Sequence, residues 1–395
     1  MKRTFRGAAL AVACMFGLAS AGHAADAIRG VTDTEIIIGT YTDLSGVTAT
    51  WGINNANAWR MAFEEQNAKG GIHGRKIRYI VEDSQYQVPR SIQAANKLIN
   101  RDNVFMMVGN GGTPMNNAVM PDQLAKGVPN VFPLTAARSM YEPFHKLKFG
   151  QFASYYDQIR AGLKLFLETK GIQAPCAMYQ DTDFGRDVMD GVRDQLAAMN
   201  RKLVADTAHK PTDTDFGASI AKLRDARCDM LVLATIVRDT NQIVAAVNKA
   251  GWKVPMLGQS AIYDSAVAEV PGGANDGLYA MTPALFAYPD DPRPAVRAFA
   301  TTYKAKFGRD PNFAAEVGYG AAGAVILGLQ NAGRDLTVDR FVKGMEQING
   351  YVDVFGSPSM TFSDTSHHGS TQSFLVQVRD GRWTQVTPEP IGYGG

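Results

Sequence analysis

Residues 35–83 constrain the fold of this chain most strongly, because strand-like and helix-like patterns alternate there at short intervals. Residues 35–41 form a β-branched run typical of a buried parallel strand. Residues 56–67 carry apolar side chains at helical spacing, and the glycines within residues 70–74 end that helix. Residues 76–81 then alternate like a second strand. This strand–helix–strand unit predicts a parallel sheet with a ligand crevice at the carboxyl ends of its strands.

The same alternation recurs along most of the chain and predicts an α/β protein. Helical patterns, such as residues 151–168 and 240–250, separate the predicted strands. One sheet holding every strand would be very wide, so two lobes, each with a doubly wound parallel sheet, are the more economical arrangement. The further predicted strands are residues 104–108, 129–132, 176–179, 202–206, 230–233 and 255–258.

The first 24 residues have the pattern of a secretory signal peptide. Three basic residues precede an apolar run at residues 8–19, and small residues at 22 and 24 suit a signal peptidase. We therefore expect an exported protein, cleaved after Ala24. The apolar run is shorter than the ~20 residues that span a bilayer. A membrane anchor and a lipid attachment through Cys14 are the alternatives.

The charge balance argues against nucleic acid as a partner. The chain has 40 basic and 38 acidic residues, and the segment 1–24 holds three of the basic ones and no acidic one. The mature chain is therefore nearly neutral, with no excess of positive charge for a phosphate backbone.

Cys176 and Cys228 are the two cysteines that remain after cleavage. Two cysteines in an exported chain suggest one disulfide. Each opens a predicted strand, and the first and third strands of a doubly wound lobe are neighbours, so both sulfurs would lie at the same edge of the sheet. The alternative is two buried free thiols.

The chain shows no motif of a familiar enzyme. It lacks a phosphate-binding loop that ends in Gly-Lys-Ser or Gly-Lys-Thr, and it lacks a nucleophile elbow. His367 and His368 are adjacent, and neighbours on a strand point to opposite faces, so they make a poor metal chelate. We expect them in a solvated loop. The sequence thus predicts a protein that is not an enzyme and has no cofactor or metal.

Several motifs, in this order, resemble the periplasmic leucine/isoleucine/valine-binding proteins, the solute-capturing subunits of one class of ABC importer. The resemblance covers nearly all of the mature chain. It implies a type I periplasmic binding fold, in which three crossing segments join the two lobes as a hinge. The motifs are IG at 38–39, LSG at 44–46, NAKGGIHGRKI at 67–77, VGN at 108–110, PNVFP at 129–133, QDTDFG at 180–185, KAG at 249–251 and FGRDP at 307–311.

The resemblance also implies the lobes, the partners and the location. The partners would be a small carboxylate-bearing solute and the ABC permease subunits of the inner membrane, and we expect a monomer in the periplasm. The crossings would fall near residues 149–150, 277–283 and 356–360, so that the first lobe comprises residues 28–149 plus 282–356 and the second 150–281 plus 357–395.

Two strand–helix turns are the candidate hooks for the carboxylate. At residues 109–114, backbone N–H groups at a helix N-terminus would bind an anion, and Thr113 would add its hydroxyl. The family places its carboxylate-binding serine or threonine here. In the second turn Leu134, Thr135 and Ala136 fall at or beside positions that contact the ligand in the family. Arg138 follows, either as a pocket charge or as a surface ion pair.

Aromatic residues are expected to cover the ligand. Trp51, in a loop, stands where the family carries an aromatic cover, and Phe184 stands at the position of a pocket tyrosine. Tyr155, with Tyr156 beside it, lies just past the first crossing and is a further candidate.

The chain departs from the family at Ser260. Amino-acid binders of the family carry a glutamate there that pairs with the ligand's ammonium, whereas this chain has Gln259 and Ser260. A buried ammonium without a carboxylate partner is costly. Either another acid replaces the glutamate, or the ligand has no amine and Arg238 suits its carboxylate. The candidate acids are Asp181, Asp239 and Asp264.

The function predicted from this resemblance is the capture of amino acids of the branched-chain type for an ABC importer. Two alternatives remain open. The ligand is an amine-free aromatic or short organic carboxylate, or the protein is a sensor that reports its ligand to a membrane receptor.

Overall fold

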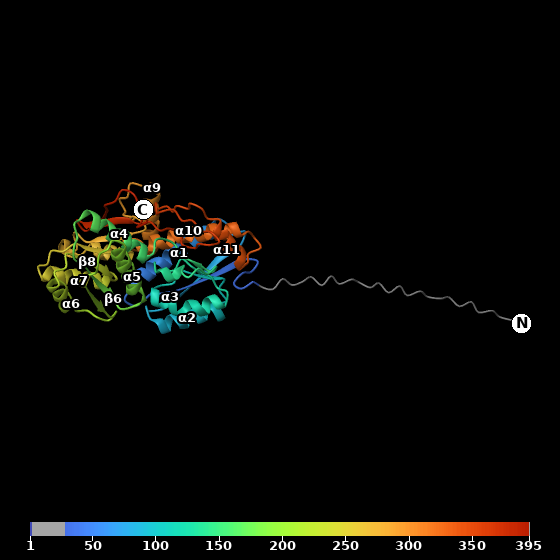
Figure 1. Ribbon diagram of the computed structural model, residues 1–395. Helices are drawn as coiled ribbons and strands as arrows, with labels where there is room; N and C mark the ends of the chain where they lie inside the picture. Colours follow the sequence, from blue (N-terminus) through green and yellow to red (C-terminus); the bar gives the residue numbers. More distant parts are fainter. Residues whose placement is uncertain (2–27, 395) are drawn as a thin grey trace.

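The computed structural model describes Met1 and residues 28–394, so all but the first residue of the predicted signal peptide lies outside the described residues. The strands of the described part form two sheets, and these occupy opposite ends of an elongated molecule (Figure 1). In that view α6, α7, β6 and β8 lie at one end, and α2, α3 and α11 lie toward the other.

The first sheet is parallel and has the strand order β2-β1-β3-β4-β5. Helices α1 (Ala49–Ala68), α2 (Val88–Asn100) and α3 (Thr113–Ala125) connect its first four strands. The order reverses direction at β1 and β3, which places a crevice outside their carboxyl ends. The strands are β1 (Glu35–Thr42), β2 (Lys76–Asp83), β3 (Met106–Val108), β4 (Asn130–Val131) and β5 (Lys148–Phe149).

Alternation along β1 explains why both faces of this sheet are covered. Successive strand side chains point to opposite faces. Ile36 and Ile38 belong to a buried cluster with residues of α1, α10 (Phe313–Ala332) and α11 (Val338–Glu346). Ile37 lies in a second cluster, with residues of α2 and α3. The continuous β-branched run is therefore buried on both sides.

The second sheet has the strand order β12-β11-β10-β9-β8-β6-β7. Its strands β6 to β10 are parallel, whereas β11 runs antiparallel to both β10 and β12. The strands are β6 (Pro175–Gln180), β7 (Ala205–His209), β8 (Met230–Ala234), β9 (Met256–Gly258), β10 (Tyr279–Thr282), β11 (Phe374–Arg379) and β12 (Arg382–Gln385). Helix α4 (Tyr155–Thr169) precedes these strands, and the helices between the parallel strands are α5 (Asp183–Ala198), α6 (Gly217–Asp225), α7 (Val237–Lys249) and α8 (Ser265–Ala268).

The chain passes from one sheet to the other three times. After β5 it enters α4 and the second sheet, and after β10 it returns through α9 (Pro294–Phe307), which packs on α1. After α11 it goes back to the second sheet as β11. We call these three passages the hinge. The bounds of the two lobes stay a prediction.

Two elements differ from the sequence pattern in their bounds. Helix α1 begins at Ala49 rather than near residue 56, so Trp51 lies in its first turn and not in a loop. Strand β7 covers residues 205–209 rather than 202–206, because pairing with β6 begins at Ala205, opposite Cys176. Val204 is half exposed, so its apolar side chain does not mark the strand.

The prediction that His367 and His368 occupy a solvated loop is wrong. His367 is 1% exposed, and its ring stacks on Phe149 with the centroids 3.8 Å apart. His368 stacks on Tyr141 at the same separation. Their segment pairs with the first passage through a bridge between Gly150 and His368, where the His367 ring is buried and the His368 side chain is only 11% exposed. Burial lowers the pKa of both histidines. Within the described residues no group of three His, Cys, Asp or Glu side chains is placed to hold a metal ion.

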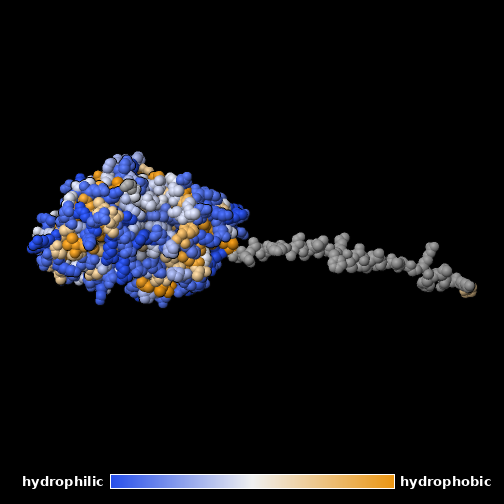
Figure 2. Space-filling model, in the orientation of Figure 1, coloured by the Kyte–Doolittle hydropathy of each residue, from blue (hydrophilic) through white to orange (hydrophobic). Residues whose placement is uncertain are grey.

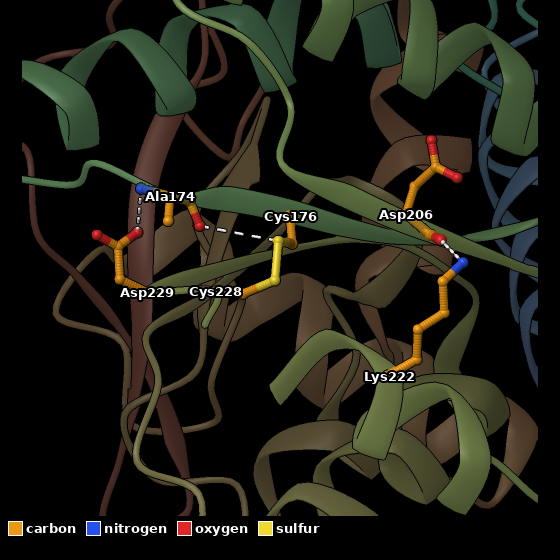
Figure 3. Close-up of a disulfide and its surroundings, with 6 residues drawn as sticks. All are labelled: Ala174, Cys176, Asp206, Lys222, Cys228 and Asp229. Carbon is orange, nitrogen blue, oxygen red and sulfur yellow. Dashed lines mark hydrogen bonds between the residues drawn. A yellow bond between two sulfur atoms is a disulfide. The ribbon is translucent and has the colours of Figure 1, made fainter. Parts of the chain in front are cut away.

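Cys176 and Cys228 are joined by a disulfide, with their Cα atoms 5.8 Å apart (Figure 3). Cys176 lies at the amino end of β6, and Cys228 comes just before the amino end of β8, the parallel neighbour of β6. Asp229 accepts hydrogen bonds from the backbone N–H groups of Gln173 and Ala174, at 2.7 and 2.9 Å. These bonds fix the start of β6 beside the disulfide.

Helix α10 is the one helix of the described part that is long and apolar enough to cross a membrane. However, 72% of its apolar stretch is buried inside the protein, as a core helix would be. The face of the molecule seen in Figure 2 is mainly hydrophilic, with hydrophobic residues in scattered patches.

Candidate ligand-binding site

A cavity of about 170 Å³ lies where the carboxyl ends of strands from both sheets face each other. The first sheet contributes residues that end or follow β1, β3 and β4, and the second sheet contributes residues that follow β6, β8 and β9. Ligands of open α/β sheets bind at this end of the strands. The wall is mostly apolar and aromatic, as small-molecule sites usually are.

Six of the eight residues predicted from the sequence line this cavity. They are Trp51, Thr113, Leu134, Thr135, Tyr155 and Phe184. The two others are not among the described residues that line it. Ala136 is buried, and its carbonyl accepts the N–H of Tyr155 at 2.7 Å. Ser260 is 3% exposed, with its N–H bonded to Gln158 Oε1 at 2.8 Å, and its neighbour Ala261 lines the cavity instead.

Thr113 and Thr135 form the polar end of the first-sheet wall. Their hydroxyl oxygens are 2.6 Å apart, and both side chains are buried. Thr113 is the first residue of α3, where backbone N–H groups have no partner within the helix. The N–H of Gly112 donates to the carbonyl of Leu134 at 3.3 Å, which holds the two turns side by side. Two hydroxyls beside a helix N-terminus suit a carboxylate.

Gly112 allows the two turns to approach the cavity this closely. Its φ of 84° lies in the left-handed region, which glycine enters without strain. A Cβ at this position would also lie only 2.8 Å from the Tyr86 ring. Tyr86, just beyond β2 with a φ of 53°, lines the cavity but was not predicted. The turn that positions the Tyr86 ring has no recognisable pattern in the sequence.

Aromatic rings of the second-sheet wall face the Thr113–Thr135 pair. Tyr155 and Phe184 pack edge to face with their centroids 5.0 Å apart, at the first turns of α4 and α5. Ser154 fixes the start of α4 through a capping box with Asp157. Burial raises the pKa of the Tyr155 hydroxyl, which therefore stays neutral. Ile236 and Val237, after β8, extend the apolar wall and were also not predicted.

Asp43 and Asp264 are the two carboxylates among the described lining residues. Asp43 accepts backbone N–H groups of Ser45, Gly46 and Thr48 and the hydroxyl of Thr48, so structural donors occupy both its oxygens. Asp264 accepts one bond on each oxygen, from Ala266 N and Asn312 Nδ2, both at 2.9 Å. A carboxylate has about four acceptor sites, so Asp264 has capacity left. Burial raises its pKa, which a nearby cation would oppose.

The other two candidate acids are used elsewhere. Asp239 is fully buried and pairs with Arg238 at 2.5 Å, while Gln180 and His209 each approach it at 3.1 Å. Asp181 pairs with Arg186 at 2.8 Å. Neither acid is among the described residues that line the cavity.

Arg238 lines the cavity, and Asp239 holds its guanidinium in place. Two of its nitrogens, Nε and Nη2, donate to Asp239 Oδ1 at 2.9 and 2.5 Å. Arg238 thus brings a guanidinium that is paired with Asp239 to the second-sheet wall, and one alternative left open by the sequence is that this residue suits an amine-free carboxylate.

Arg138 makes an ion pair outside the cavity wall. It joins the segment after β4 to α5, with Nε 2.8 Å from Asp187 and Nη2 2.8 Å from Asp190. Asn117 of α3 likewise donates to Asp183 of α5 at 2.9 Å. We call these contacts the rim. They connect the two sides of the cavity without lining it.

Comparisons with known proteins agree with this architecture. A family model described as periplasmic binding protein matches residues 35–382. The leucine-specific-binding protein of Salmonella typhimurium is 23% identical over 277 residues, which are 70% of this chain and 74% of that protein. The leucine-, isoleucine-, valine-, threonine-, and alanine-binding protein of Pseudomonas aeruginosa is 23% identical over 327 residues, 82% of this chain and 83% of that protein.

Solved structures share the fold at low sequence identity. A fatty acid ABC transporter substrate-binding protein from Thermomonospora curvata superposes with a TM-score of 0.82 at 23% identity, covering 91% of this chain and 93% of its own. A branched chain amino acid ABC transporter from Thermus thermophilus with bound valine gives 0.82 at 17% identity, covering 91% and 97%. With two sheets, three passages and a family match over most of its length, this chain belongs to the periplasmic binding protein family.

Proposed function

We propose that this protein is the periplasmic solute-binding subunit of an ABC importer and that it captures an amino acid of the branched-chain type. The observation that carries the proposal is the Thr113–Thr135 hydroxyl pair beside the α3 N-terminus, which opens on a mostly apolar cavity. A carboxylate on that pair would place an aliphatic side chain against Phe184 and Val237. The relatives named for leucine, isoleucine and valine support this substrate class.

Binding would draw the two sides together. The solute's carboxylate would meet the first-sheet hook, and its apolar part would meet the second-sheet wall. A ligand shifts a two-state equilibrium only when it binds one state better, and contacts on both sides favour the closed state. The closed protein would then dock on the permease subunits.

Thermal unfolding of the mature protein tests the proposal directly. Leucine, isoleucine or valine at about 100 times its dissociation constant should raise the free energy of unfolding by ~2.7 kcal/mol. Glycine, which shares their carboxylate and ammonium but has no apolar side chain, is the control. Unchanged unfolding with all three branched-chain amino acids would contradict the proposed substrate class.

Asp264 is expected to bind the ammonium in place of the family's glutamate. Asp264→Asn removes the negative charge but keeps the shape of the side chain. It should weaken leucine binding by about 10- to 100-fold, because a hydrogen bond to a charged group contributes roughly 1.5–3 kcal/mol. Isothermal titration with leucine measures the loss.

The matched ligand for this experiment is 4-methylpentanoate, which is leucine without its amine. Its affinity should be nearly unchanged by Asp264→Asn. If the variant loses leucine and 4-methylpentanoate equally, the substitution has disturbed the cavity, and Asp264 does not read the amine.

The second candidate function is the capture of an amine-free aromatic or short organic carboxylate. Two observations favour it, the serine at position 260 and the fixed charge of Arg238 in the wall. In that case Arg238→Met would weaken binding of phenylacetate or benzoate, and wild-type protein would prefer these acids to leucine.

The rim is expected to stabilise the closed state. Arg138→Met removes ion pairs that join α5 to the segment after β4, and it should lower solute affinity about 2- to 5-fold, since partly exposed ion pairs contribute at most ~1 kcal/mol. The effect should shrink at high salt. Arg340→Met, at an exposed ion pair with Asp335 on one side of the molecule, is the control and should leave affinity unchanged. A wild-type affinity in Arg138→Met would show that the rim does not contribute to closure.

A further inference from the structure

A second, much smaller cavity lies at the hinge, where all three passages meet. The first passage contributes Gln151 and Phe152, the second contributes Pro283 and Ala284, and the third contributes residues from Asp353 to Met360. Glu316 and Val317 of α10 complete the wall. The cavity holds about 10 Å³, which is close to the smallest volume that accommodates one water molecule.

Two acceptor oxygens in this wall have no hydrogen-bond partner among the described residues. One is Glu316 Oε2, on a side chain that is 1% exposed, and the other is Gln151 Oε1, on a side chain that is 7% exposed. The remaining polar atoms of both side chains are used. Glu316 Oε1 accepts the N–H of Ala287 at 2.7 Å, and Gln151 Nε2 donates to the carbonyl of Val317 at 3.2 Å. A buried polar atom left without a partner is destabilising.

The charged neighbours of the cavity do not supply the missing donors. Asp353 accepts the N–H groups of Phe355 and Ser357 and the hydroxyl of Ser357, at 2.9, 3.1 and 2.7 Å. Arg293 is committed to Asp291, with Nη2 2.7 Å from Oδ2. No described residue is a hydrogen-bond partner of either oxygen, so a molecule from the solvent is the natural candidate.

We propose that the hinge cavity binds one buried water molecule, which bridges Glu316 Oε2 and Gln151 Oε1 and so ties the first passage to α10. Water has two donors, one for each acceptor, and its size matches the volume of the cavity. The site is separate from the solute cavity, and nothing in the proposed function requires it.

Water also fits this site better than a cation does. Burial, with the charge of Asp353 adding to it, raises the pKa of Glu316 well above its ordinary value. The water can stay bound when Glu316 is protonated. Oε2 then donates to the water, and the water still donates to Gln151 Oε1. A cation needs the ionised carboxylate and would lose its ligand on protonation.

A crystal structure of the mature wild-type protein is the direct test. We expect one isolated density peak in the cavity, within hydrogen-bonding distance of Glu316 Oε2 and Gln151 Oε1. An empty cavity would overturn the proposal. A peak with several oxygens at about 2.4 Å would also overturn it, because that distance indicates a cation. If the cavity binds a cation such as sodium, the melting temperature of the protein would rise when sodium replaces choline as the cation of the buffer.

A double-mutant cycle tests the same water in solution. Ala284→Val fills the cavity and should strand both acceptors, lowering the melting temperature by roughly 2–4 °C. Gln151→Met removes one of those acceptors, so in that background Ala284→Val should lower the melting temperature clearly less. Equal losses in the two backgrounds would show that no shared water couples the two residues and would overturn the proposal.

Discussion

Replacing Thr113 and Thr135 together by valine is expected to lower the affinity for the solute by about 100-fold or more. Valine keeps the shape of threonine but has no hydroxyl. The two hydroxyls are buried and hydrogen-bonded to each other at 2.6 Å at the polar end of the cavity, so a carboxylate that accepts from both would replace this mutual bond. A hydrogen bond to a charged group contributes roughly 1.5–3 kcal/mol, and two such bonds, less about 1 kcal/mol for the mutual bond that they replace, account for the loss. Isothermal titration, with the solute that stabilises the protein in the thermal-unfolding experiment, measures this loss of affinity.

The protein contains a matched control for this substitution. Thr235 and Thr240 are also buried, and their hydroxyl oxygens are also 2.6 Å apart. Neither belongs to the described wall of the cavity. The double variant Thr235→Val/Thr240→Val should therefore bind the solute as the wild type does. If Thr113→Val/Thr135→Val binds equally well, the carboxylate is held elsewhere, and Arg238 becomes the first alternative.

The place of Thr113 and Thr135 at the cavity follows in part from topology. Thr113 and Thr135 come directly after β3 and β4, and the carboxyl ends of neighbouring parallel strands meet at one edge of the sheet. Phe184 follows β6 in the same way. Period and turn residues were enough to predict these strands, whereas the choice of Thr135 and Phe184 beyond them rested on the family resemblance.

Residues placed by tertiary contacts were harder to predict. Ser260 follows β9 but is turned away, because its N–H bonds Gln158 of α4, and that helix is far away in sequence. His367 and His368 look like a polar loop in sequence, and only the pairing of two distant passages buries His367 and covers most of His368. Neither contact leaves a local pattern.

One missed element did have a local signal. Strands β11 and β12 form a hairpin whose two turn residues, Asp380 and Gly381, have φ angles of 50° and 72°. Asp-Gly between two alternating apolar runs is a strong indication of such a hairpin. Strands β11 and β12 are antiparallel with no helix between them, so they stand outside the strand–helix alternation from which the other strands were predicted.

Removal of the Cys176–Cys228 disulfide is expected to lower the free energy of unfolding by about 4 kcal/mol. The two cysteines are 52 residues apart, and closing a loop of that length in the unfolded chain accounts for a loss of this size in the chain-entropy model. The double variant Cys176→Ala/Cys228→Ala, unfolded by urea beside the wild type, gives the measurement. Both sulfurs are buried, so part of the loss would come from packing.

Treatment with a reductant distinguishes the stability that the disulfide contributes from the stability that packing contributes. Dithiothreitol should destabilise the wild type toward the level of the variant and leave the variant unchanged. Two free thiols, the alternative reading of the sequence, would instead give a wild type that is insensitive to dithiothreitol. Solute affinity should not change, because the disulfide joins the amino ends of β6 and β8, whereas the cavity lies at their carboxyl ends. A folded variant with normal affinity and reduced stability would therefore show that the bridge stabilises the second sheet without shaping the site.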